Sequence, residues 1–158
     1  MAVDDVVPLV GIKLDDSRML RLGMSREDAE ALLVGHRDMQ VGFCGNPPVL
    51  AFIQSPKHWG TYDGIELFEM AADDVIAEIV RRRNLDPRIY CPGEGCYYFP
   101  DLEMSLWRSC PSSVEGEQGY VFDCVSLHSP GYYSPELMEF HRRICRLPIE
   151  PEQNPNVS

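Results

Sequence analysis

The sequence has no long apolar run and few positive charges, and both shortages restrict what the protein can do. No stretch approaches the roughly 20 apolar residues of a transmembrane helix. Residues 1–5 lack the basic start and apolar core of a signal peptide. The 158 residues carry 14 Lys and Arg against 25 Asp and Glu, a net charge of −11. We therefore expect a cytoplasmic protein that binds neither nucleic acid nor anionic membranes, because both attract basic surfaces.

The motifs that usually mark an enzyme or a bound cofactor are also missing. The sequence contains no phosphate-binding loop, no dinucleotide-binding glycine motif, no HExxH zinc motif and no Gly-x-Ser-x-Gly nucleophile turn. Cys91 and Cys96 form the one close cysteine pair, whereas a structural zinc site normally needs two such pairs. We therefore predict no catalytic residues, no metal site and no cofactor, and we favour a non-enzymatic role over an enzymatic one.

What the sequence does contain is typical of one folded domain. Its 44% hydrophobic and 25% charged residues are ordinary values for a globular protein. We predict a single domain over residues 1–147, followed by a flexible, proline-rich tail over residues 148–158. The charge is uneven, because residues 1–80 hold 14 acids and 6 bases, and residues 81–158 hold 11 acids and 8 bases. An electrostatic docking face is thus expected in the N-terminal half.

Two segments have the pattern of amphipathic helices, and a third begins with a helix-start signal. Ser25 can cap a first helix that ends near Gly35 and has acids in its first turn. A second helix is predicted over residues 72–83, where two acids open an apolar stripe and three arginines close it. The third starts at Ser134, a cap that is followed by proline at the first helical position.

Short β-type segments precede the first helix and follow each of the first two. They are predicted at residues 6–14, 39–44, 49–54, 62–70, 88–91, 96–99, 102–108 and 120–128. The pattern predicts an α+β fold, with an antiparallel sheet and about three helices on one face. Because a helix is followed by short strands twice, two tandem helix-plus-sheet units are a further expectation.

An acidic segment and the aromatic loop before it form the candidate binding surface. Residues 64–69 alternate apolar and acidic side chains, as expected for a half-exposed strand. Aromatic residues near acids make good anchors for a protein partner, and the loop that precedes this segment contains two. The predicted partner-binding residues are Trp59, Tyr62, Asp63, Glu66 and Glu69.

The run from Leu22 to Gly35 resembles the helix of BamE-like and beta-lactamase-inhibitor-like repeats. Those repeats combine a glycine, a capping Ser or Thr, two or three acids and a terminal Leu-Leu-Gly. The chain departs from them at His36-Arg37, where a proline is usual, and it lacks their signal or lipoprotein start. In size, charge and architecture it is also similar to small acidic bacterial immunity proteins, which bind and block a toxin. This second resemblance implies a basic protein partner.

The expected function is therefore protein binding without catalysis, as an immunity or inhibitor protein that neutralises a basic toxin. An acidic surface attracts a basic partner and speeds their encounter. The alternative is a small-molecule-binding protein or enzyme with a site lined by His58, Tyr62, Asp63 and Glu66. A third reading is a subunit of a larger assembly whose charge serves solubility. The sequence favours no particular oligomeric state.

Overall fold

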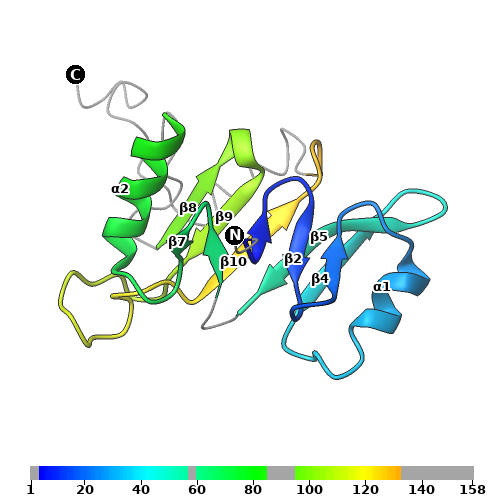
Figure 1. Ribbon diagram of the computed structural model, residues 1–158, viewed down its shortest axis with the longest axis horizontal. Coiled ribbons are helices and arrows are strands. Elements are labelled where there is room, and N and C mark those ends of the chain that lie inside the picture. The colour runs from blue at the N-terminus through cyan, green and yellow to red at the C-terminus, as the bar shows by residue number, and fades with distance from the viewer. Residues whose placement is uncertain (1–3, 57–59, 85–94, 133–158) are drawn as a thin grey trace, which may run out of the picture.

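Three antiparallel sheets and two α-helices form an α+β domain in the residues that the computed structural model describes, which are 4–56, 60–84 and 95–132 (Figure 1). The first sheet contains β1 (Val6–Val7), β2 (Gly11–Lys13) and β3 (Met19–Arg21) in that order. A small hairpin contains β6 (Thr61–Tyr62) and β7 (Ile65–Glu66). The helices are α1 (Arg26–Leu32) and α2 (Ala72–Arg83).

The largest sheet has five strands and joins segments from both halves of the chain. Its order is β4 (Gln40–Cys44), β5 (Val49–Ser55), β10 (Cys124–His128), β9 (Met104–Trp107) and β8 (Cys96–Phe99). A 3-10 turn, η2 (Pro100–Leu102), connects β8 to β9. The strands that follow α1 and those that follow α2 therefore build one shared sheet, with β5 beside β10 at the junction.

Strand register gives this sheet one apolar and one polar face. On the apolar face, Leu106 lies between Tyr97 and Val125 on the neighbouring strands. This face carries the hydrophobic core, to which the two smaller sheets and α2 also contribute. On the polar face, Ser126 lies between Ser105 and Gln54. All five residues of β10 are nevertheless buried, so both of its faces are covered.

Both predicted helices within the described residues are confirmed. The Ser25 hydroxyl caps α1 by accepting the amide of Asp28 at 3.1 Å. The second helix has the predicted bounds and ends at Asn84 in the left-handed conformation. The helix expected from Ser134 and the tail over residues 148–158 lie outside the described residues. Among the described residues, no helix is long and apolar enough to cross a membrane.

The sequence predicted that the helices lie together on one face of one sheet. The structure shows that α1 and α2 do not. Helix α1 packs against β3 and β5, whereas α2 packs against β7. Figure 1 shows them at opposite ends of the domain, separated by the sheets. The β2–β3 hairpin precedes α1, and the β6–β7 hairpin precedes α2, so each helix starts from a different small sheet.

Two predicted strands are each interrupted by a turn. Residues 6–14 fold back after Pro8, where the Val10 amide donates to the Val7 carbonyl at 3.0 Å. Residues 62–70 contain only the short β7, because Asp63-Gly64 forms the turn between β6 and β7. The strand predicted at 96–99 has the predicted bounds. Those predicted at 39–44, 49–54, 102–108 and 120–128 are present with shifted ends, whereas 88–91 lies outside the described residues.

Candidate functional site

The predicted partner-binding residues occupy very different environments. Glu66 and Glu69 are exposed. Tyr62 is only 5% exposed, so it packs in the core and is not the exposed anchor that the sequence suggested. Burial raises the pKa of its phenol. Asp63 is half-buried, and Trp59 lies outside the described residues, as does His58. Among the described members of this set, only the two glutamates are therefore fully at the surface.

Asp63 belongs to a tight hairpin turn and lies close to positive charge. Both turn residues have positive φ, 52° at Asp63 and 75° at Gly64, as a two-residue Asp-Gly hairpin turn requires. The carboxylate of Asp4 accepts both of their backbone amides, at 2.7 and 3.0 Å. The guanidinium of Arg82, near the basic end of α2, donates to the Asp63 carbonyl. The backbone of Asp63 is therefore tied to the basic end of α2.

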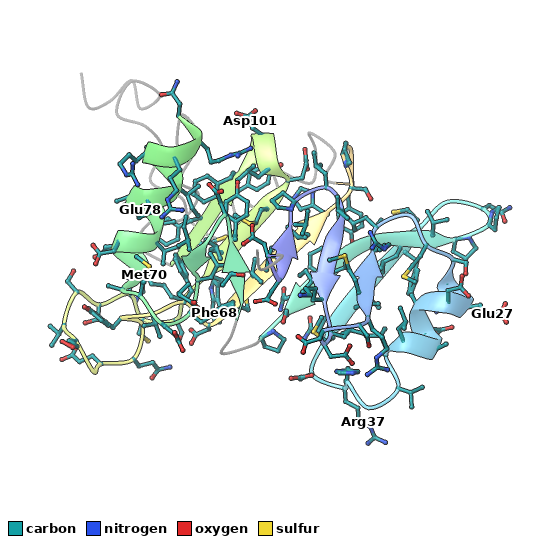
Figure 2. All side chains as sticks on the ribbon, in the orientation of Figure 1. Glu27, Arg37, Phe68, Met70, Glu78 and Asp101 are labelled. Atoms are coloured by element: carbon teal, nitrogen blue, oxygen red, sulfur yellow. The ribbon has the colours of Figure 1, made fainter. Side chains whose placement is uncertain are left out.

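The opposite end of α2 has the reverse character. The segment that enters this helix contains Phe68 and Met70, which Figure 2 labels, and it lies beside the loop of residues 112–119, yellow in Figure 1. The two segments are joined because the Ala72 amide donates to the Tyr120 carbonyl at 2.8 Å. We call their exposed carboxylates the acidic end, which consists of Glu66, Glu69, Asp73, Asp74, Glu115 and Glu117.

A buried arginine holds the acidic end in place. Arg108 is 5% exposed, and its Nη2 donates to Asp73 at 2.8 Å and to the Tyr97 hydroxyl at 2.7 Å. Its Nη1 donates to the Gly119 carbonyl at 3.1 Å. Pairing of this kind offsets the cost of burying the guanidinium charge, although the buried Nε has no hydrogen-bond partner among the described residues. Arg108 thus fixes the loop and the start of α2 against the sheet without adding exposed positive charge.

The loop itself is ordered by its own hydrogen bonds. The hydroxyl of Ser112 donates to the Glu117 carboxylate at 2.8 Å and accepts the Val114 amide at 3.0 Å. The Glu117 amide donates to the Val114 carbonyl at 3.1 Å. These bonds leave the side chain of Val114 56% exposed at the centre of the loop. The loop therefore presents an exposed apolar residue next to Glu115, and its hydrogen bonds hold the Glu117 carboxylate in place.

Most basic side chains of the described residues are engaged by acids elsewhere. Arg18 pairs with Asp15 at 2.7 Å. Arg81 and Arg82 both pair with Glu78, and their hydrogen bonds lower the pKa of that carboxyl to about 2. By contrast, the described residues offer no ion pair to Glu69, Asp74 or Glu115. The negative charge of the acidic end is therefore largely uncompensated.

Two titratable side chains, His128 and Glu103, are in contact on the polar face of the large sheet. The sequence analysis did not predict this pair. The Nδ1 of His128 lies 2.6 Å from Glu103 Oε2, which also accepts the Tyr98 hydroxyl at 3.3 Å. Burial lowers the pKa of His128 to about 4 and raises that of Glu103. His128 is 0% exposed, and its backbone amide also donates to the Glu103 carbonyl at 3.1 Å. Only the β9–β10 pairing brings these residues together.

The described residues hold neither a metal-binding cluster nor a disulfide. No three His, Cys, Asp or Glu side chains among them are arranged to bind a metal ion. Cys44 and Cys110 are exposed thiols, and Cys124 is a buried thiol. Cys91, the partner of Cys96 in the sequence, lies outside the described residues.

Comparisons with protein-family models, with curated proteins and with solved structures found no match. The resemblance of residues 22–35 to the BamE-like and beta-lactamase-inhibitor-like repeats stays a prediction, as does the similarity to immunity proteins. The geometry and charge of the acidic end are therefore the features from which a function can be inferred.

Proposed function

We propose that the chain is a protein-binding domain whose acidic end docks a basic partner, in the manner of an immunity or inhibitor protein that neutralises a toxin. The observation that carries this proposal is the set of uncompensated carboxylates on two segments held together through Arg108. Because the backbone of both segments is already joined, a partner would not have to bring the two segments together on binding.

The chemistry of the acidic end also specifies the partner. Clustered carboxylates create a local negative potential that attracts Lys and Arg side chains and speeds encounter. Val114, which precedes Glu115 in the loop, adds an exposed apolar contact, and protein interfaces usually combine apolar contacts with a polar rim. The expected partner surface is a basic patch around a small apolar depression.

The alternative, a small-molecule or enzyme site near Tyr62, receives less support. Tyr62 is buried, and Asp63 lies beside Arg82. Of the four residues in that hypothesis, only Glu66 is both described and fully exposed. The described residues thus favour no reaction at this position, and protein binding is the function that we carry forward.

The test is affinity capture from a lysate of the source organism at low salt, followed by measurement of binding with the purified partner. The informative variant is Glu69→Gln/Asp74→Asn/Glu115→Gln, which removes three uncompensated charges from the acidic end. We expect a stoichiometric basic protein whose affinity falls at least about tenfold in this variant, since rim charges each contribute a fraction of a kcal/mol or more.

The matched control is Asp16→Asn/Glu27→Gln/Asp101→Asn, which removes three exposed acids elsewhere. Glu27 occupies the first turn of α1 as Asp74 occupies that of α2, so helix-dipole effects are balanced. This control should bind like the unmodified chain. A complete lack of a stoichiometric partner at low salt, or equal weakening by both triple variants, would overturn the proposal.

A further inference from the structure

The hairpin formed by β4 and β5 is unusual because it carries no charge. Residues 39–56 contain no Asp, Glu, Lys or Arg, although a quarter of the whole chain is charged. This segment forms one end of the five-stranded sheet, with β4 as an edge strand. A second molecule could therefore approach this edge without meeting like charge along the strand, which its net charge of −11 would otherwise oppose.

The edge also lacks the devices with which proteins usually block strand pairing. Those devices are lysines, prolines, bulges and very short strands. Strand β4 has five residues, Gln-Val-Gly-Phe-Cys, and contains neither lysine nor proline. The one irregularity in the hairpin lies on β5, where Ala51 is skipped between the partners of Gly42 and Phe43. Among the described residues, no strand pairs with the outer side of β4.

From this edge we infer that the protein forms a dimer in which β4 pairs antiparallel with β4 of a second copy, about a two-fold axis at Gly42. This register places Val41 opposite Phe43 and Gln40 opposite Cys44 of the second copy. Val41 and Phe43 are both half-buried and pack at the margin of the core. The Arg26 guanidinium lies 5.0 Å from the centre of the Phe43 ring, and its charge is paired with Glu30. In the dimer they would cover each other, and the polar residues would stay on the other face of the joined sheet.

A second copy fits this edge better than the basic partner proposed for the acidic end. A neutral strand has no attraction for a cationic surface, and its apolar pair is complementary to itself. The two functions also use opposite ends of the domain, since α2 and α1 lie far apart in Figure 1. Five residue pairs form a small interface, so we expect a weak, concentration-dependent dimer that does not depend on the acidic end.

The test uses sedimentation of the full chain under reducing conditions, from micromolar to near-millimolar concentration. Gln40 and Cys44 are exposed, so their side chains can be changed with little effect on the fold. In the proposed register, Gln40→Glu/Cys44→Glu sets like charges directly opposite at both ends of the pair. Gln40→Lys/Cys44→Glu sets opposite charges there instead. We expect the first variant to weaken the dimer at least about tenfold and the second to match or exceed the unmodified chain.

Val34→Glu/Ala31→Glu is the control, because it adds the same two charges at exposed positions in and just after α1, outside β4. It should dimerise like the unmodified chain, and thermal melting should show that all variants fold. A chain that stays monomeric at every concentration overturns the inference. So does a dimer that responds equally to both Gln40/Cys44 variants, because its contact would then not have this register.

Discussion

The two ends of the domain use the same antiparallel scaffold for opposite purposes. At the start of α2, exposed carboxylates lie on two neighbouring segments, and Arg108, the cation that pairs with Asp73, is buried. At the β4–β5 end, charge is missing from eighteen consecutive residues, and a strand edge is open among the described residues. One end is suited to long-range attraction of a basic surface, and the other to short-range pairing between backbones.

In this account, side-chain charges would recognise a partner at the acidic end, and the backbone of β4 would do so at the other end. Charges at the acidic end act over about 10 Å at ordinary ionic strength and weaken as salt rises. Backbone pairing at β4 acts only on contact, and salt should affect it little. Figure 2 illustrates the separation, with Met70 near the acidic end and Glu27 and Arg37 near the other. Substitutions can therefore be chosen to affect one end of the domain, both ends, or neither.

The largest effect is expected from Arg108→Leu, which releases the acidic end. The change leaves the Tyr97 hydroxyl and the Gly119 carbonyl without their buried donor, so we expect a loss of about 3 kcal/mol in unfolding free energy. Arg18→Leu breaks an exposed pair of similar length and should cost less than about 1 kcal/mol. Denaturant titration compares the two variants. Equal losses would show that Arg108 does not anchor the loop.

Acid should weaken the sheet that joins both ends, through His128. Folding lowers its pKa from 6.5 to about 4, so the unfolded chain binds a proton that the native state does not. Stability should therefore fall as pH decreases from about 6.5 to about 4, by at most about 3 kcal/mol from His128, and the raised pKa of Glu103 acts in the opposite direction. His128→Gln should flatten this slope, measured by denaturant titration at several pH values. An unchanged slope would assign the acid sensitivity to other groups.

The starts of the two helices offer a paired test of about 1 kcal/mol. Ser25 caps α1, whereas α2 follows Ala71, which supplies no side-chain cap. We expect Ser25→Ala to cost about 1 kcal/mol and Ala71→Ser to add about half as much. Thermal melting of both variants checks the signs. If Ala71→Ser destabilised the chain, the junction at the acidic end would be too tightly packed for a cap.

The smallest effect concerns two exposed thiols, one at each end. Cys44 ends β4, and Cys110 begins the chain segment that leads to the 112–119 loop. Both should react with a thiol reagent in dilute protein, whereas Cys124, whose pKa burial raises to about 12, should not. At high protein concentration, Cys44 should become a few-fold slower because β4 pairs, and Cys110 should not change. Peptide mapping locates the modified residues. Equal slowing of both would point to general aggregation.

Local signals predicted the helices well, and long-range pairing limited the rest. The cap at Ser25 and the acids and arginines of residues 72–83 are contained within single segments, so both helices were found. The sheet order depends on contacts such as Ser126 with Gln54, 72 residues apart, which no local pattern encodes. The Asp63-Gly64 pair is a local signal for a hairpin turn, whereas the apolar–acidic alternation of residues 64–69 predicts a continuous strand. The structure contains the turn.

The candidate site was predicted only in part, for the same reason. Glu66 and Glu69 were identified because a local alternation exposes them. Tyr62 was expected at the surface, yet its strand faces the core once β6 pairs with β7. Glu115 and Glu117 join the acidic end through Arg108 and Asp73, which are 35 residues apart in the sequence. Charge counting found the acidity, and only the fold shows which acids lie together.

The most direct test of the central claim, that the acidic end is the cation-binding surface, is an NMR titration of the full chain with a short oligo-arginine peptide at low salt. Amide shifts should concentrate in residues 64–74 and 112–119, disappear as salt is raised, and be absent from residues 40–55. Shifts spread evenly over the exposed acids, or centred on the β4–β5 hairpin, would contradict the account.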